Sequence, residues 1–262
     1  MWKEKEKMKF DAIIFDWAGT TVDYGSFAPV KAFIEAFEEF GITPTVEEVR
    51  KPMGMLKIDH IRTMMQMERI SNLWTEKYNR SWTEEDVKKV YELSEKKVIE
   101  IVGNFATPKP YVVETIKKLK DLGLKIGSTT GYTDEMMSIV VPKAKEYGYE
   151  PDCWFSPDST NKIGRPYPYM IFKNMEKLKL KSVSKILKVG DTISDIKEGK
   201  NAGVITVGII EGSSQMGLTE EEYNNLTDIE KEKICDKVSK EYFSAGAYYV
   251  IKDIREILDL VK

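Results

Sequence analysis

Short apolar runs alternate with amphipathic stretches along most of the chain. The apolar runs predict buried strands at residues 10–16, 124–129, 186–190, 204–210 and 248–251. In the stretches between and after them, apolar residues recur with helical spacing. These stretches predict helices at residues 112–122, 133–147, 167–178, 194–202, 227–243 and 253–261. Strands that alternate with helices are typical of βαβ units, so the pattern predicts a parallel sheet.

Two segments of this pattern carry weaker signals. Pro142 lies inside the helix predicted at residues 133–147. Because proline lacks a backbone N–H, we expect a kink there. The short run at residues 152–155 predicts a brief additional strand.

One long stretch, between about residues 25 and 103, breaks the alternation. It is rich in Met, Lys and Glu and has helical rather than strand spacing. Helices are predicted at residues 28–40, from Pro52, and from Thr83 to near Gly103, and Thr45 with Glu48 fits a capping box. We therefore predict an α/β fold, a Rossmann-like doubly wound parallel sheet with an inserted helical cap domain. The predicted division is residues 1–24 and 104–262 for the core and 25–103 for the cap.

Composition excludes several classes of protein. The chain has 262 residues, 42% hydrophobic and 32% charged, with a net charge of −3. That length fits one core with a smaller insert and excludes a disordered or collagen-like chain. The longest apolar run, at residues 204–210, is far below the roughly 20 residues of a membrane-spanning helix. The mixed Lys and Glu lack the basic excess of a nucleic-acid-binding protein.

Cysteine and histidine usage excludes another kind of site. Cys153 and Cys235 lie far apart, and His60 is the single histidine of the chain, so a zinc site built from these residue types is excluded. We expect both cysteines to be thiols in a reducing compartment. Residues 1–9 are charged and contain no apolar stretch, unlike a signal peptide, which favours a cytoplasmic location.

Polar side chains gather where the predicted strands end. Asp16 ends the first strand and Thr130 follows the second, while Asp191 and Asp195 follow a later one, with Arg165 in an intervening loop. Taken singly, each acid is also typical of a helix N-cap, and the cation of an ordinary loop. Ligands of open α/β sheets bind at the carboxyl ends of the strands, where these side chains would meet. Carboxylates suit magnesium and can attack phosphorus, and a hydroxyl and a cation can hold phosphoryl oxygens. Together they predict a magnesium phosphate site.

The order of these motifs resembles the haloacid dehalogenase superfamily of phosphoryl-transfer enzymes. Most members carry Asp two residues after the nucleophile, where it protonates the oxygen of the leaving group, whereas this chain has Ala18. An alanine at this position resembles the pattern of one family, the phosphonoacetaldehyde hydrolases. Four segments carry the resemblance: DWAGTTVDYG (16–25), RKPMGMLKIDH (50–60), GSTTGYT (127–133) and GRPYP (164–168).

The resemblance implies hydrolysis of the carbon–phosphorus bond of phosphonoacetaldehyde to acetaldehyde and phosphate. Direct attack on phosphorus would expel a carbanion-like enolate, whereas a lysine imine of the aldehyde lets a neutral enamine depart. The family's cap lysine matches Lys57, and Asp16 matches the nucleophile that becomes an aspartyl-phosphate. Because this leaving group needs no proton on oxygen, an acid at Ala18 is not required.

The resemblance also implies the ligands of the cofactor and of the phosphoryl group. It implies Mg²⁺ held by Asp16, the backbone carbonyl of Ala18, and Asp191, with Asp195 supporting this shell. It implies phosphate binding by Thr130, Gly131 and Arg165, and a homodimer.

Residues around Lys57 provide candidate catalytic neighbours. If residues 52–64 are helical, Met53, Lys57 and His60 fall on one stripe of the helix. A histidine of near-neutral pKa could then move protons during imine formation. Met53 could keep Lys57 partly dry and so lower the pKa of its amine. Tyr132 could orient a water molecule or the lysine.

Two alternatives stay open. The first is a magnesium-dependent phosphatase of the same superfamily acting on an ester, which Ala18 and Lys57 disfavour. The second is an inactive ligand-binding relative, which the intact set of Asp16, Lys57, Arg165 and Asp191 disfavours. The magnesium pattern also disfavours the dehalogenase branch. Trp74 and Trp82 are expected in the cap core or in a dimer contact.

Overall fold

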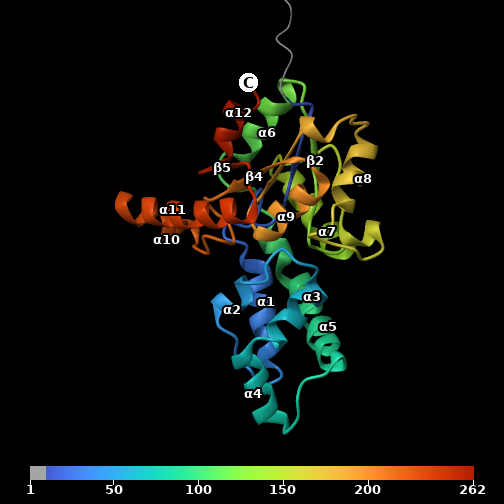
Figure 1. The fold of residues 1–262 in the computed structure, drawn as a ribbon, viewed down its shortest axis with the longest axis vertical. Helices are drawn as coiled ribbons and strands as arrows, with labels where there is room; N and C mark the ends of the chain where they lie inside the picture. The colour runs from blue at the N-terminus through green and yellow to red at the C-terminus, as the bar shows by residue number, and fades with distance from the viewer. Residues whose placement is uncertain (1–9) are drawn as a thin grey trace, which may run out of the picture.

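A five-stranded parallel sheet forms the centre of the protein (Figure 1). The computed structural model describes residues 10–262, so the prediction for residues 1–9 lies outside the described residues. The strand order is β2-β1-β3-β4-β5. Their bounds are β1 (Ala12–Phe15), β2 (Lys125–Ser128), β3 (Ile186–Gly190), β4 (Ile205–Ile209) and β5 (Tyr249–Ile251). The α/β fold with a Rossmann-like parallel sheet is confirmed.

The place of β1 in the sheet determines where the site forms. β1 pairs with β2 on one side and with β3 on the other, and all its residues are buried. Strands covered on both faces read as continuous apolar runs, which explains why the sequence pattern identified them. Because the strands are parallel, the segments after β1, β2 and β3 emerge at the same edge.

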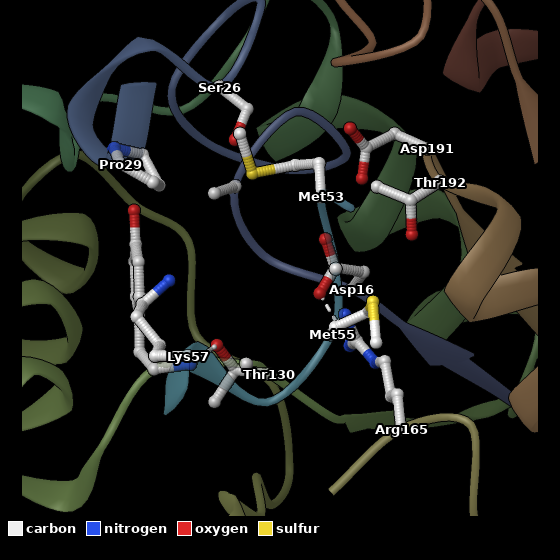
Figure 2. Close-up of a pocket in the computed structure, with 14 residues that line it drawn as sticks. Asp16, Ser26, Pro29, Met53, Met55, Lys57, Thr130, Arg165, Asp191 and Thr192 are labelled. Atoms are coloured by element: carbon white, nitrogen blue, oxygen red, sulfur yellow. Dashed lines mark hydrogen bonds and ion pairs between the residues drawn. The ribbon is translucent and has the colours of Figure 1, made fainter. Parts of the chain in front are cut away.

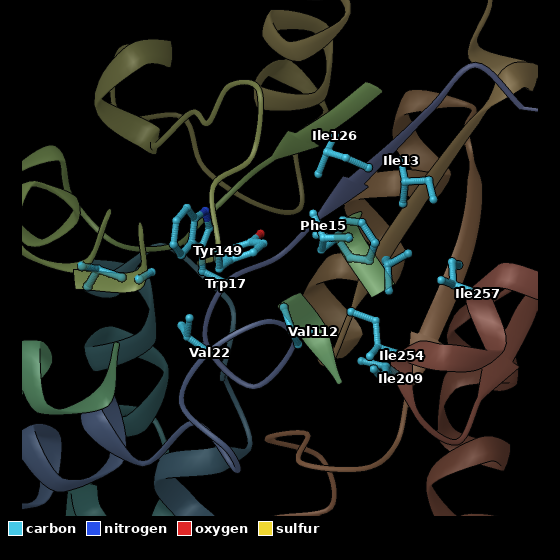
Figure 3. Close-up of a cluster of buried hydrophobic side chains, with 14 of the residues drawn as sticks. Ile13, Phe15, Trp17, Val22, Val112, Ile126, Tyr149, Ile209, Ile254 and Ile257 are labelled. Atoms are coloured by element: carbon cyan, nitrogen blue, oxygen red, sulfur yellow. The ribbon is translucent and has the colours of Figure 1, made fainter. Parts of the chain in front are cut away.

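Helices cover both faces of the sheet. Ile13 and Phe15 of β1 pack in one hydrophobic cluster with Val112, Ile254 and Ile257, as Figure 3 shows. Ile14, between them, packs in a different cluster, because successive strand residues point to opposite faces. The helices after the cap are α6 (Val112–Asp121), α7 (Asp134–Glu146), α8 (Tyr169–Lys177), α9 (Ile193–Ala202), α10 (Glu220–Asn224), α11 (Asp228–Ala245) and α12 (Ile257–Leu260). Short 3-10 helices are η1 (Val102–Phe105), η2 (Pro157–Thr160), η3 (Val183–Lys185) and η4 (Ile254–Glu256).

Three details of the core differ from or refine the sequence pattern. The strand predicted at residues 152–155 is wrong, because only Phe155 forms a bridge, to Thr129. Pro151 and Pro157 flank this segment, and neither can donate a backbone N–H to a neighbouring strand. Helix α7 runs through Pro142. The helix predicted at residues 253–261 is divided into η4 and α12.

Five helices gather into a separate unit beyond the strand ends (Figure 1). They are α1 (Phe27–Glu38), α2 (Val46–Arg50), α3 (Lys57–Met65), α4 (Glu68–Tyr78) and α5 (Glu84–Ile101). The unit has its own hydrophobic cluster, in which Trp74 is buried and against which Trp82 packs, so both belong to its core. Capping boxes begin α2 at Thr45 and α5 at Thr83.

The start of α3 differs from the prediction. The predicted helix from Pro52 is wrong, because α3 begins at Lys57. Gly54 has a φ of +84°, a left-handed conformation that a continuous right-handed helix does not contain. Met53 therefore lies in the turn before the helix, and the predicted single stripe of Met53, Lys57 and His60 does not form.

The helices of residues 10–262 are all too short or too polar to cross a lipid bilayer.

Candidate active site

A pocket opens where β1, β2 and β3 end, and the segment before α3 covers it. Figure 2 shows Asp16 at its centre, with Lys57 on one side and Asp191 on the other. The pocket brings together most of the predicted site residues. Its lining is Asp16, Ala18, Ser26, Pro29, Met53, Gly54, Met55, Lys57, Thr130, Gly131, Tyr132, Arg165, Asp191 and Thr192. Of the residues predicted to act here, His60 and Asp195 do not line it.

Asp16 follows β1 directly and is held by both backbone and side chain. Its N–H donates to the carbonyl of Val189 at 2.9 Å, which extends the β1–β3 pairing by one residue. Arg165 Nη2 donates to Asp16 Oδ1 at 2.5 Å, and both side chains are buried. Burial raises the pKa of Asp16, and the charge of Arg165 opposes this rise. The ion pair thus opposes the neutralisation of this buried carboxylate.

Three buried acids form a candidate metal centre. Carboxylate oxygens of Asp16, Asp191 and Asp195 lie within 4.8 Å of one another. Burial, followed by the charges of Asp16 and Asp195, raises the pKa of Asp191 well above its usual value. Carboxylates this close repel one another unless a cation lies between them, and oxygen ligands suit a hard divalent ion. The donor set therefore fits a metal ion.

The three acids are not equivalent. Asp195 accepts from Lys188 Nζ at 2.8 Å and forms an ion pair with Arg165 at 3.2 Å. These charges hold the pKa of Asp195 below its usual value despite its burial. Within residues 10–262, Asp191 accepts only the N–H of Ser214 at 2.7 Å and the hydroxyl of Thr20 at 3.3 Å. Asp16 and Asp191 therefore have more free ligand capacity than Asp195.

Lys57 is the first residue of α3 and projects into the pocket with 6% exposure. Its Nζ lies 4.9 Å from the ring centroid of Tyr132 and 5.3 Å from that of Phe33. Burial lowers the pKa of the Lys57 amine to about 8, while the charges of Glu95 and Asp16 work against this shift. Much more neutral amine is therefore present near pH 7 than on an exposed lysine.

His60 lies behind Lys57 rather than in the pocket. It is 1% exposed, and its ring centroid is 4.4 Å from that of Phe33. Burial, together with the charge of Lys57, lowers the pKa of His60 to about 3. The expectation of a near-neutral pKa is wrong, because burial, which is not visible in the sequence, strongly disfavours the charged form. His60 is neutral at pH 7.

The loop after β2 supplies the other predicted residues. Thr130 Oγ1 accepts the N–H of Tyr132 at 3.0 Å, which holds this turn in place. A Cβ on Gly131 would lie 3.6 Å from the carbonyl oxygen of Met55, an ordinary contact distance, so this loop lies directly against the cap segment. The hydroxyl of Tyr132 is buried and has no hydrogen-bond partner in the part of the chain that the structure describes.

Several site residues escaped sequence reasoning. Ser26 and Met55 line the pocket, but their residue types carry no signal of that role. Ser214 acts through its backbone N–H on Asp191, which any non-proline residue could provide. Arg50 lies within a motif segment and donates from the cap to the carbonyls of Gly25 at 2.7 Å and Ser214 at 3.1 Å.

The fold and the site define a class of protein. Residues 10–203, more than half of the chain, match the family described as haloacid dehalogenase-like hydrolase. The chain therefore belongs to the haloacid dehalogenase-like hydrolases.

Individual relatives narrow this class. The chain is 48% identical over 254 residues to phosphonoacetaldehyde hydrolase of Lysinibacillus sphaericus (strain C3-41). That match covers 97% of this chain and 94% of that protein. It is 52% identical over 253 residues to a bifunctional phosphonoacetaldehyde hydrolase/aminoethylphosphonate transaminase of Clostridioides difficile (strain 630). That match covers 97% of this chain and only 40% of the bifunctional protein. Within its class, the chain belongs to the phosphonoacetaldehyde hydrolase family.

A solved structure agrees with this placement. A phosphonoacetaldehyde hydrolase-like protein from Oleispira antarctica has a TM-score of 0.93 and 36% sequence identity. The match covers all of this chain and 95% of that chain.

Proposed function

We propose that this protein hydrolyses the carbon–phosphorus bond of phosphonoacetaldehyde, releasing acetaldehyde and phosphate. One observation carries the proposal: a buried lysine amine, Lys57, lines the same pocket as the strand-end carboxylate of Asp16. Position 18, where an ester phosphatase of this class needs a carboxylic acid, is alanine. The names of the relatives support the same substrate.

The first step activates the substrate for cleavage. The neutral amine of Lys57 adds to the aldehyde carbon, and loss of one water with uptake of one proton gives a protonated imine. The pKa of about 8 supplies this amine near neutral pH. When the carbon–phosphorus bond later breaks, the bonding electrons pass into the protonated imine and leave a neutral enamine.

The second step transfers the phosphoryl group to the protein. An oxygen of Asp16 attacks phosphorus, the carbon–phosphorus bond breaks, and an aspartyl-phosphate forms. Arg165 and Thr130, with Gly131 in the same turn, hold the phosphoryl oxygens. One water then hydrolyses the aspartyl-phosphate. The enamine takes a proton on carbon, and a second water releases acetaldehyde and Lys57. The net consumption is one water.

The proposed cofactor is Mg²⁺, held by Asp16, the carbonyl of Ala18, and Asp191, with Asp195 supporting. When bound, the ion supplies positive charge that offsets the carboxylates and the phosphonate. Lys57 lies on the other side of Asp16, where it can reach the aldehyde end of a substrate whose phosphonate faces the acids (Figure 2).

The remaining pocket residues shape the surroundings of Lys57. Met53 and Tyr132 are 8% and 3% exposed, and we propose that they exclude water from the amine. Neutral His60 supports Lys57 without adding a charge to the site.

Borohydride trapping tests this function most directly. Borohydride reduces an imine to a stable secondary amine, so phosphonoacetaldehyde plus borohydride should inactivate the protein and label Lys57. Peptide mapping identifies the labelled residue. Without a label on Lys57, the imine route is overturned. Phosphate release across a panel of esters and the phosphonate then measures the ester-phosphatase alternative.

We also propose a homodimer, a cytoplasmic location, and a cap at residues 25–103. Tyr167, Tyr169 and Phe172 are all exposed, which offers a second copy an aromatic surface to cover. Cys153 and Cys235 form no disulfide, and we propose that they are thiols in a reducing compartment. Light scattering measures the mass of the assembly, and cell fractionation measures the location.

A further inference from the structure

Two oppositely charged side chains are fully buried beneath the pocket, in positions that the mechanism above does not use. Lys188 lies in the middle of β3 and Glu198 lies on α9, and both side chains have 0% exposure. Neither residue lines the pocket. Burying a charge is strongly unfavourable unless partners compensate it. The partners of this pair therefore indicate what it does.

Lys188 gathers three oxygens behind the site. Its Nζ donates to Asp195 Oδ1 at 2.8 Å and to Thr129 Oγ1 at 3.0 Å, and lies 3.4 Å from Glu198 Oε2. The hydroxyl of Thr129 in turn donates to the same Glu198 oxygen at 3.1 Å. Glu198 is thus held in one orientation from two directions.

Glu198 uses that same oxygen to hold Arg165. It accepts from Arg165 Nε at 3.0 Å. The other two nitrogens of the guanidinium are also engaged, Nη1 with Asp195 at 3.2 Å and Nη2 with Thr129 at 2.9 Å. Because a guanidinium is planar, contacts at all three nitrogens determine the orientation of the whole group. The edge that remains directed at the pocket is Nη2, 2.5 Å from the nucleophile Asp16.

We propose that Glu198 and Lys188 are positioning residues for Arg165. Glu198 fixes the Nε edge of the guanidinium, and Lys188 compensates the charge of Glu198 and orients its carboxylate. Arg165 then presents Nη2 to Asp16 and to the phosphoryl group in transfer. The inference rests on the proposed function, since it assigns Arg165 to the phosphoryl group. The spacing of Asp195 and Glu198, three residues apart on α9, places both acids on the face that meets Arg165.

A double-mutant cycle with Arg165 tests the inference. Glu198→Gln keeps the shape of the side chain, and Glu198→Ala removes it. Arg165→Lys keeps the charge but lacks Nε, the atom that Glu198 holds. We expect Glu198→Ala to lower kcat for phosphonoacetaldehyde by about 10- to 100-fold in the parent protein, the usual size of an effect on an orienting contact. In the Arg165→Lys background the same change should lower kcat by no more than about 3-fold, because the contact between Glu198 and Nε is already absent.

A matched control separates positioning from stability. Asn174 is as buried as Glu198 and binds the backbone of Ser128, but it does not contact Arg165. Asn174→Ala should therefore lower the unfolding midpoint while kcat stays within about 2-fold of the parent. If Glu198→Ala behaves like Asn174→Ala, or lowers kcat equally in both Arg165 backgrounds, the inference is overturned.

Two further readouts complete the test. If Glu198→Ala does not fold, the cycle is run with Glu198→Gln. Glu198→Gln should lower kcat by a smaller factor, and this effect should disappear in the Arg165→Lys background. Borohydride labelling of Lys57 should be unchanged in every Glu198 variant, because imine formation precedes phosphoryl transfer. If Lys57 is still labelled but the effects of the Glu198 and Arg165 substitutions on kcat simply add, the positioning inference is overturned and the proposed function is not. Absence of labelling in the parent protein overturns the proposed function.

Discussion

Replacement of Lys57 by arginine separates the role of a free amine from the role of a positive charge. Arginine keeps the charge and much of the length, so contacts with the rings of Phe33 and Tyr132 can persist. Its guanidinium stays protonated, with a pKa above about 12, and cannot form the imine. The fold should survive, because Lys57 is the first residue of α3 and its side chain borders a pocket rather than the hydrophobic core.

The size of the effect follows from the buried environment of the amine. With a pKa of about 8, roughly one Lys57 in ten is neutral at about pH 7. An exposed lysine would have about 0.03% neutral amine there, and arginine less than about 0.001%. The neutral fraction thus falls by at least about 10⁴-fold in Lys57→Arg. Since the imine benefits the transition state for cleavage, we expect kcat to fall by at least this factor.

The assay measures acetaldehyde and phosphate release under saturating substrate, with circular dichroism as the check on folding. Borohydride plus phosphonoacetaldehyde should label the parent protein and leave Lys57→Arg unlabelled. A folded Lys57→Arg protein that turns over the phosphonate near the parent rate would refute the imine mechanism. The ester-phosphatase reading would then be the better one.

Three other predictions follow from the same site. Excess chelator should abolish turnover and added Mg²⁺ should restore it, because Asp16 and Asp191 otherwise repel an anionic substrate; full activity in chelator would contradict the metal assignment. Ala18→Asp should lower phosphonate hydrolysis in a folded protein, since the added carboxylate has no oxygen leaving group to protonate and adds a negative charge; an unchanged or faster rate would contradict this account. Lys57→Met should stabilise the protein by up to about 3 kcal/mol below about pH 8, because the folded-state pKa of about 8 lies below the usual 10.5 and the buried cation opposes folding. That gain in unfolding free energy should shrink as pH rises from about 8 to about 10.5. Urea unfolding of both proteins at pH 7 and pH 10 measures it, and a difference that does not change with pH would contradict the prediction.

The local sequence pattern was sufficient to predict most of the helices and strands. The strands β1 to β5 are apolar runs because both faces of a parallel sheet are covered, and this property is written in consecutive residues. Thr83 and Thr227 begin helices through capping boxes that span only four residues. The acids after β1 and β3 could be expected to meet, because parallel strands end at the same edge.

The start of α3 shows where local pattern was insufficient. Pro52 is an acceptable first helical residue, but the chain turns through Gly54 in a left-handed conformation before the helix begins at Lys57. A Cβ on Gly54 would lie 2.3 Å from Thr192 Oγ1, so the turn forms where the cap meets the core. That contact joins residues far apart in the sequence.

The sequence by itself determined the fold class, the strand-end acids and the candidate amine, because each depends on residue type and short spacing. Only the tertiary structure decided the charge states and the orientations. Burial lowers the pKa of Lys57 to about 8 and that of His60 to about 3, and desolvation depends on every element packed around a group. Arg165 is oriented by Glu198, and Glu198 by Lys188, through contacts between separate elements. Such contacts leave no periodic signal, since they exist only once β3, α9 and the loop of Arg165 have packed together.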